Sequence, residues 1–186
     1  MTPNCLPCDK DQIVYRDATR KDAEAIATLH ADSWRRHYRG AFLDSYLDGD
    51  IFAERLAVWS ERLTNIREDR FAVVAVSAAS VVGFVHMVLD EDPTWGALLE
   101  NLHVTHQLKR KGIGRALLRQ AAQRLVQRGS RSFYLWVLNQ NLAAQQFYAA
   151  QGGIRVETCL RGPLPGGGRA LALRIAWLDA RALLIE

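Results

Sequence analysis

The feature that most constrains the fold of this chain is a pair of glycines, Gly112 and Gly114, set between a strand-like and a helix-like stretch. Before the pair, residues 98–104 alternate as a β-strand requires, which predicts one shared face for Leu98, Glu100, Leu102 and Val104. After it, apolar residues recur at helical spacing, at Leu117, Leu118, Ala121, Ala122 and Leu125. Glycines at such a junction let backbone N–H groups approach an anion at the positive end of a helix dipole. The segment therefore predicts a phosphate-binding turn.

The charges around the glycines favour the same interpretation. Lys109, Arg110, Lys111 and Arg115 flank them, although a helix start without a bound anion favours Asp or Glu. Residues 101–156 hold nine Lys or Arg and no Asp or Glu, whereas residues 1–100 hold 11 basic and 17 acidic residues. The alternative is a glycine turn with solvated basic side chains. A dinucleotide fingerprint and a P-loop are both excluded, because a third glycine and a G-K-[ST] sequence are missing.

A second pattern follows a strand-like run at residues 132–138. Asn141 is suited to cap a helix and Gly152 to end it. Between them, Ala144, Phe147 and Tyr148 share one helical face. The Tyr148 ring could be a core ring with its hydroxyl bonded to the backbone, or it could serve a site.

Together the two patterns resemble those of the GNAT superfamily of N-acetyltransferases. Members carry L-x-V at the end of a strand, then [QR]-x-x-G-x-[GA] at a helix start, and later N-x-x-A-x-x-F-Y-x-x-x-G-F. Here the first pattern reads Leu102-His103-Val104 followed by residues 109–114. The second runs from Asn141 to Gly152, with Phe147 and Tyr148 at the matching positions.

The resemblance covers most of the chain, from about residue 13 to residue 177. Residues 13–23 look like the opening strand and helix cap of the family. Two positions depart from the pattern: Lys109 replaces Gln or Arg, and Gly153 replaces a common aromatic residue. Lysine keeps the positive charge but lacks the planar fork of arginine, and Gly153 affects only local packing.

The resemblance implies a mixed α/β fold. Its central sheet is mostly antiparallel, the fourth and fifth strands splay apart, and helices cover both faces. Hydrophobic patterning places strands near residues 13–17, 70–76, 81–88, 95–104, 132–138, 154–160 and 170–177. Helices are expected from the Thr19 and Asp22 capping pair to about Trp34, over residues 50–63, after Gly112 and after Asn141. Residues 1–11 are predicted to be a flexible tail and residues 12–186 a single acetyltransferase domain.

The composition favours an intracellular protein. The chain is 49% apolar and 24% charged, and it shows neither a signal-peptide pattern nor an apolar run near the ~20 residues of a membrane span. We therefore expect no membrane association and a cytoplasmic location. Cys5 and Cys8 form a lone C-x-x-C far from Cys159, which predicts neither a zinc site nor a disulfide framework, so no metal is expected.

On this resemblance the cofactor is acetyl-CoA, whose pantetheine arm enters between the splayed strands. The backbone at Leu102, His103 and Val104 would bind the arm and polarise the thioester carbonyl. The diphosphate would lie on the loop formed by Lys109, Arg110, Lys111, Gly112, Ile113, Gly114 and Arg115. Asn141 would contact the arm further along, and Phe147 is assigned to the same cofactor site.

Acetyl transfer requires a neutral amine. A lysine-like amine with a pKa of about 10.4 lies about 3.4 units from neutrality at pH 7, which costs about 4.6 kcal/mol. Glu100 is the candidate base, acting through water, and its alternative is a strand glutamate that is exposed or paired with an arginine. Tyr148 matches the position of the family's proton donor to the departing thiolate, whose thiol has a pKa of about 8.5.

Other polar and aromatic residues are assigned lesser roles. His103 has the opposite parity from Glu100 and is interpreted as structural, and His30, His86 and His106 are weaker candidates still. Trp34 and Tyr38 lie one helical turn apart and could form a wall of the acceptor pocket, although core packing is the simpler use of Trp34.

Two other functions fit the same residues. One is a non-catalytic acyl-CoA-binding regulatory module, and the other is an acetyltransferase that acts on aminoacyl-tRNA or a ribosomal protein. Few aromatic residues accompany the arginines of the basic middle, which argues against nucleic-acid binding. The acceptor is expected to be the amine of a small molecule or a protein, and the acidic first half favours cations. Relatives are often dimers, and the sequence leaves the oligomeric state open between a monomer and a homodimer.

Overall fold

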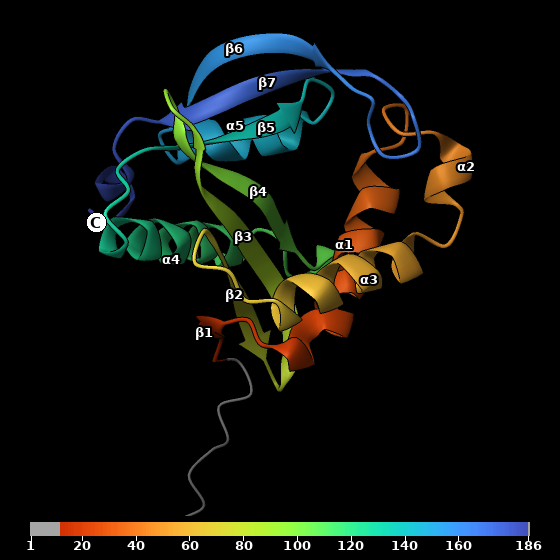
Figure 1. Cartoon of the computed structure of the whole chain (residues 1–186), viewed down its shortest axis with the longest axis horizontal. Coiled ribbons are helices and arrows are strands. Elements are labelled where there is room, and N and C mark those ends of the chain that lie inside the picture. The colour runs from red at the N-terminus through yellow and green to blue at the C-terminus, as the bar shows by residue number, and fades with distance from the viewer. Residues whose placement is uncertain (1–11, 186) are drawn as a thin grey trace, which may run out of the picture.

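The computed structural model describes residues 12–185, whose strands form one seven-stranded sheet in the order β1-β2-β3-β4-β5-β7-β6 (Figure 1). The strands are β1 (Val14–Asp17), β2 (Arg70–Ser77), β3 (Ser80–Asp92), β4 (Gly96–Val104), β5 (Phe133–Leu138), β6 (Ile154–Arg161) and β7 (Ala170–Trp177). Neighbouring strands are antiparallel except β4 and β5, which are parallel. The predicted mixed, mostly antiparallel sheet is therefore confirmed. The predicted tail, with Cys5 and Cys8, lies outside the described residues.

Helices cover both faces of the sheet, as predicted. The α-helices are α1 (Ala23–His37), α2 (Asp44–Leu47), α3 (Ile51–Thr64), α4 (Ile113–Gln127) and α5 (Leu142–Ala150), and the 3-10 turns are η1 (Arg20–Asp22), η2 (His106–Leu108) and η3 (Ala180–Leu183). Figure 1 shows α1 and α3 on one side of β2 to β4 and α4 on the other. None of these helices combines the length and the apolar character that crossing a bilayer requires.

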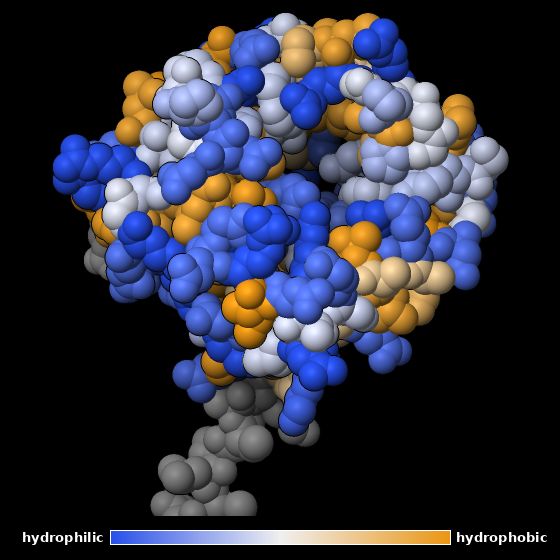
Figure 2. Space-filling model, viewed as in Figure 1, coloured by the Kyte–Doolittle hydropathy of each residue, from blue (hydrophilic) through white to orange (hydrophobic). Residues whose placement is uncertain are grey.

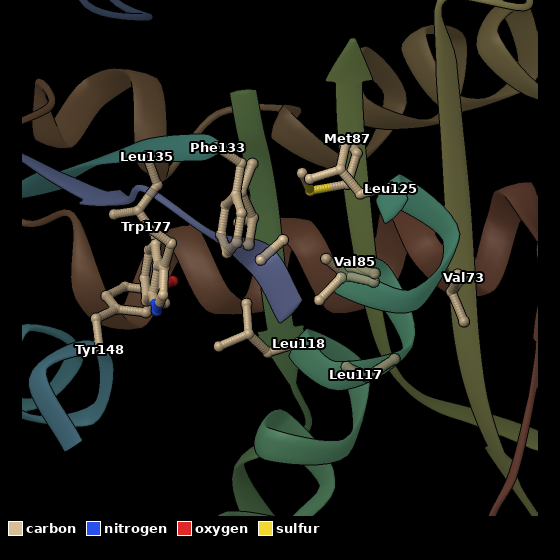
Figure 3. Close-up of a cluster of buried hydrophobic side chains, with 14 of the residues drawn as sticks. Val73, Val85, Met87, Leu117, Leu118, Leu125, Phe133, Leu135, Tyr148 and Trp177 are labelled. Carbon is tan, nitrogen blue, oxygen red and sulfur yellow. The ribbon is translucent and has the colours of Figure 1, made fainter. Parts of the chain in front are cut away.

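Alternating residues of the strands divide the core between the two faces. On the α4 face, Val73 and Val85 pack against Leu117 and Leu118. On the α1/α3 face, Phe84 packs against Ile26, and Trp59 of α3 joins them. Figure 3 shows the α4 face, where the rings of Phe133, Tyr148 and Trp177 extend the core towards β5 and β7. Met87, Leu125 and Leu135 belong to the same cluster. The apolar periodicity of the sequence thus predicts both halves of this core.

A β-bulge interrupts β4 at Glu100. His86 of β3 pairs with Asn101, and the next residue, Met87, pairs with Leu99. Glu100 is therefore an extra residue with no partner in the β3–β4 ladder. Such a bulge changes which face the following side chains occupy.

The bulge corrects two predictions about faces. Glu100 does not share a face with Leu102 and Val104, because its carboxylate contacts Arg62 of α3 whereas the two apolar residues pack on the α4 face. His103 is not on the opposite face from Glu100, because its ring contacts α1 at Ser33. Strict alternation through residues 98–104 is wrong, and both polar side chains lie on the α1/α3 face.

Trp177 fills the space beside Gly153. A Cβ placed on Gly153 would lie 2.6 Å from Cγ2 of Ile175 and 2.7 Å from Cζ2 of Trp177. The Trp177 ring stacks on Phe133 with centroids 4.5 Å apart, and its Nε1 donates to the Gln151 carbonyl at 2.9 Å. The departure from the family pattern at Gly153 therefore leaves no gap, because a ring from β7 packs there.

This packing predicts that even a methyl group is not tolerated at position 153. Gly153→Ala should lower the free energy of unfolding by about 1–3 kcal/mol, the usual range for an overpacked core. Urea unfolding followed by tryptophan fluorescence measures the change. An unfolding midpoint equal to that of the wild type would show that Ile175 and Trp177 can move apart without cost.

Candidate active site

The candidate site lies where β4 and β5 separate. In the described chain, ladder pairs join the two strands only at Ala97–Phe133 and Leu98–Tyr134. Beyond these pairs, β4 continues to Val104 and β5 to Leu138, so the predicted splay is confirmed. The facing edges carry N–H and C=O groups that an extended ligand with its own amides can pair with.

The turn before α4 has the backbone form of an anion cradle. Gly112 is the N-cap of α4 with φ +80°, and Arg110 has φ +63°. The first N–H groups of a helix have no partner inside it, and the first turn of α4 contains no acidic side chain. A Cβ on Gly112 would meet no atom within 4 Å, so the space in front of the turn is open. These features fit a diphosphate.

The basic side chains of the turn do not all face the cradle. Nζ of Lys109 donates to Nε2 of His37 on α1 at 2.7 Å, and burial lowers the pKa of both groups. Arg110, Lys111 and Arg115 are exposed, and none of them forms an ion pair with another residue in the range 12–185. Three cations are thus available to an anion, while a phosphate contact by Lys109 stays a prediction.

The two sequence motifs meet at Gly114. A Cβ on this glycine would lie 3.4 Å from Cζ of Phe147, so the ring of Phe147 lies against the start of α4. Phe147 also contacts Tyr148, with ring centroids 5.1 Å apart. The structure therefore brings the glycine turn and the aromatic face of α5 together, as a shared site requires.

Tyr148 is buried, with 8% of its surface exposed, but its hydroxyl has no hydrogen-bond partner among residues 12–185. The ring packs edge-on against Trp177 (Figure 3). Burial raises the pKa of the Tyr148 phenol, and the nearby phenol of Tyr38 raises it further. A core tyrosine normally bonds its hydroxyl to the backbone, so this free, protonated hydroxyl favours the role of a proton donor.

Asn141 acts as the N-cap of α5. Its Oδ1 accepts a hydrogen bond from the Ala144 N–H at 3.2 Å, as the sequence predicts. Gln145 reaches back from the same helix and donates to the carbonyls of Leu138 and Asn139 at 3.2 and 2.8 Å. The end of β5 is thereby fixed, and a contact between Asn141 and a cofactor stays a prediction.

Glu100 is held by two strong donors. Its carboxylate forms a bidentate pair with Arg62, at 2.6 and 2.9 Å, and bonds Nδ1 of His86 at 2.8 Å. Burial raises the pKa of this carboxyl, but the bonds from His86 and Arg62 outweigh it and lower the pKa to about 2. Glu100 is thus paired with an arginine, which the sequence offered as the alternative to a role as the base. A carboxylate with such a low pKa is a weak proton acceptor.

Three histidines extend the polar cluster on the α1/α3 face. Nε1 of Trp59 donates to Nδ1 of His30 at 3.0 Å, and Nδ1 of His103 lies 2.8 Å from Oγ of Ser33. Burial lowers the pKa of His30, His86 and His103, the last to about 3. All three rings are therefore neutral near pH 7 and pack as uncharged polar groups.

Trp34 and Tyr38 occupy different environments. Trp34 is buried, with 8% of its surface exposed, and packs edge-on against Phe42 at 5.0 Å, so it is a core residue. Tyr38 follows the end of α1, and burial raises the pKa of its phenol to about 12. Tyr38 packs against the same buried cluster as Leu138 at the end of β5, and a contact between Tyr38 and the acceptor stays a prediction.

The structure adds contacts that no motif indicated. Gln140 donates from Nε2 to the Arg39 carbonyl at 2.7 Å, which ties the loop after β5 to the loop after α1. The connection between β6 and β7 also closes on this region, because a Cβ on Gly166 would lie 2.6 Å from Tyr46. These contacts join segments far apart in sequence, and short-range patterns carry no signal for them.

Comparisons with known proteins identify the class of protein that this fold and site define. A model of the Acetyltransferase (GNAT) family matches residues 25–152. The chain is 30% identical over 146 residues to the uncharacterised N-acetyltransferase YuaI of Bacillus subtilis (strain 168), covering 77% of this chain and 82% of that protein. This chain belongs to the GNAT acetyltransferase family, which confirms the resemblance of its two motifs.

Solved structures show the same fold. The PaiA N-acetyltransferase of Thermoplasma acidophilum, in complex with coenzyme A, superposes with a TM-score of 0.67 at 21% identity, covering 87% of this chain and 98% of that chain. YncA of Salmonella typhimurium, a putative acetyltransferase with its cofactor acetyl-CoA, gives a TM-score of 0.66 at 17% identity. The match covers 90% of this chain and 94% of that chain.

Proposed function

We propose that this chain is an acetyl-CoA-dependent N-acetyltransferase that acts on a primary amine by direct attack in a ternary complex. The observation that carries the proposal is the contact between the left-handed turn before α4 and the ring of Phe147, which brings α5 and its buried Tyr148 to that turn. The strands β4 and β5 separate in the same part of the sheet. The CoA and acetyl-CoA complexes of its structural neighbours support the choice of cosubstrate.

The binding groups divide along the length of the cosubstrate. N–H groups of the Gly112 to Arg115 turn would hold the diphosphate, with Arg110 and Lys111 adding charge. The free edges of β4 and β5 would pair with the amides of the pantetheine arm. A main-chain N–H within residues 102–104 would donate to the thioester oxygen and stabilise the negative charge that develops there.

The chemistry then requires two proton movements. The acceptor nitrogen bonds to the carbonyl carbon, and the carbon–sulfur bond breaks as the intermediate collapses. Tyr148 donates its phenolic proton to the departing sulfur and regains a proton from solvent, while the acceptor nitrogen loses one proton to become an amide. That Glu100 accepts this second proton stays a prediction. To do so, its carboxylate would have to lose a hydrogen bond from Arg62 or His86, so that one oxygen is free.

These pKa values predict which group controls the pH dependence. Glu100, with a pKa of about 2, and His103, with a pKa of about 3, keep one protonation state from pH 6 to 9. The rise of kcat/KM with pH should therefore follow the acceptor amine, about tenfold per pH unit for an amine with a pKa of about 10.4.

Two acceptors of different basicity test this. With an α-amine, whose pKa is about 8, the same rise should level off near pH 8. Glu100→Gln should leave the midpoint of the rise in kcat/KM with pH unchanged for both acceptors. A midpoint that is the same for both acceptors would instead assign the rise to a group on the enzyme.

An acceptor screen tests the proposed function itself. Purified protein is incubated with acetyl-CoA and a panel of amines, and release of the free thiol is followed with a chromogenic disulfide. We expect thiol release that depends on both the enzyme and an amine. Binding of acetyl-CoA without amine-dependent release across the panel would instead support the non-catalytic acyl-CoA-binding module.

A further inference from the structure

Aromatic and arginine side chains gather on one face of β5, β6 and β7, which we call the Trp136 face: Trp95, Tyr134, Trp136, Arg161 and Arg174. Arg174 lies at its centre, with its guanidinium 4.7 Å from the Trp136 ring centroid and 4.8 Å from that of Tyr134. Asp92 and Glu157 neutralise Arg174 at 2.8 and 2.9 Å. Arg174 is thus a structural cation with its charge already balanced.

Arg161 differs because its charge is not balanced. It is exposed at the end of β6, and its guanidinium lies 4.4 Å from the Trp136 ring centroid. Its register partner on β7 is Ala170, and Ala172 also faces this side, so no large side chain of β7 blocks its path to Trp136. Within residues 12–185, Arg161 has no carboxylate at ion-pair distance. Stacking on Trp136 therefore holds an uncompensated cation in place.

The Trp136 face leads to the candidate reaction centre. Leu138 lies two residues after Trp136 on the same face, about 7 Å along the strand. Leu138 and Tyr38 both pack against the buried cluster that contains Trp34. The β6–β7 connection closes on the same end of the face through Gly166 and Tyr46. Figure 2 shows that the surface is hollowed between β5 and β7 and the helices α1 and α2. An acceptor approaching Tyr38 across this face therefore passes Arg161.

Four carboxylates on the helical side of this approach already have cationic partners. Glu54 pairs with Arg55, and Glu100 pairs with Arg62. Arg39 binds both Asp44 and Asp48. These four carboxylates, all from the acidic first half of the sequence, are therefore not free to attract a cationic acceptor.

Resting on the proposed acetyltransferase activity, we propose that the acceptor is a carboxylate-bearing amine whose carboxylate is bound by Arg161 on the Trp136 ring. The planar guanidinium matches a carboxylate with two parallel hydrogen bonds, and the ring fixes its plane. Arg161 is thus a residue that determines acceptor specificity. It takes no part in the proton movements at Tyr148.

The test compares acceptors that differ only in the terminal charge. Straight-chain amines of four to eight carbons are assayed by thiol release as ω-amino acids, as their amides and as diamines. We expect kcat/KM to be at least tenfold higher for the acid than for its amide, and lowest for the diamine. Arg161→Gln should raise the KM for the acid to that of its amide, while kcat for the acid and kcat/KM for the amide stay as in the wild type. Arg161→Glu should reverse the order, so that kcat/KM is highest for the diamine and lowest for the acid.

Arg155→Gln is the matched control, because Arg155 is exposed on the same strand, bonds Thr158 and lies outside the Trp136 face. It should leave the ratio between acid and amide unchanged. Acetyl-CoA titration checks that every variant is folded. If the wild type acetylates amines but no acid better than its amide, or if Arg161→Gln keeps the ratio, the inference is wrong and the proposed function stands. If acetyl-CoA binds and no amine is acetylated, the proposed function fails and the inference fails with it.

Discussion

Tyr148→Phe should lower kcat about 100-fold or more at pH 7 and leave the KM for acetyl-CoA nearly unchanged. General acid catalysis contributes about 10²- to 10⁴-fold, and a group that acts only in the transition state affects kcat rather than binding. The hydroxyl has no protein partner among residues 12–185, so the substitution breaks no hydrogen bond of the described chain. The loss should shrink above about pH 8.5, where the free thiolate is stable without a donor.

Steady-state kinetics at several pH values measure this effect. Tyr15→Phe is the matched control, since Tyr15 lies on β1, where it pairs with Ala75 of β2, away from the opening between β4 and β5. The control should keep wild-type kcat. Equal kcat for Tyr148→Phe and the wild type at pH 7 would remove Tyr148 from the chemistry and leave the core-ring interpretation.

Gly112→Asp should weaken acetyl-CoA binding about 100-fold without unfolding the protein. The left-handed N-cap position tolerates Asp better than most residues, and the space for its side chain is open. A carboxylate there also interacts favourably with the positive end of the helix dipole. Two unit charges about 5 Å apart repel by about 3 kcal/mol at an effective dielectric constant of about 20, so the same carboxylate would oppose a diphosphate bound at this turn. Stability and affinity should therefore change independently.

Gly129→Asp is the control, because Gly129 has φ +85° and equally open space just after the other end of α4. That position is about 26 Å from Gly112 along the helix, well beyond the Debye length of about 8 Å at physiological salt. Calorimetric titration of both variants at two salt concentrations should show weak binding for Gly112→Asp alone, with a smaller penalty at high salt. Equal losses in both variants would indicate backbone strain rather than repulsion of an anion.

The sequence predicts the elements of this fold well because burial follows short-range periodicity. The strands and helices begin and end within a few residues of the expected positions, and the capping pair appears as hydrogen bonds from Thr19 to the Asp22 carboxylate at 2.7 and 2.9 Å. The four-residue helix α2 was not anticipated, since it is too short to show an apolar period.

The details of the site depend on contacts between distant segments. The bulge at Glu100 exists in the pairing of β3 with β4, so alternation within β4 alone assigns the wrong face. The pairing of Glu100 with Arg62 spans 38 residues, and the bond from Lys109 to His37 spans 72. The two motifs, by contrast, are local and can be found from the sequence, whereas the contact between Gly114 and Phe147 is visible only in the structure.

The account depends on the diphosphate cradle, and a paired titration tests it most directly. Folded wild-type protein is titrated in a calorimeter with acetyl-CoA and, separately, with S-acetylpantetheine, which has the same thioester arm and no diphosphate. We predict one acetyl-CoA site per chain and binding at least 100-fold weaker for the truncated thioester. Equal affinities for the two thioesters, or no heat with either, would contradict the assignment of the turn before α4 as the phosphate site.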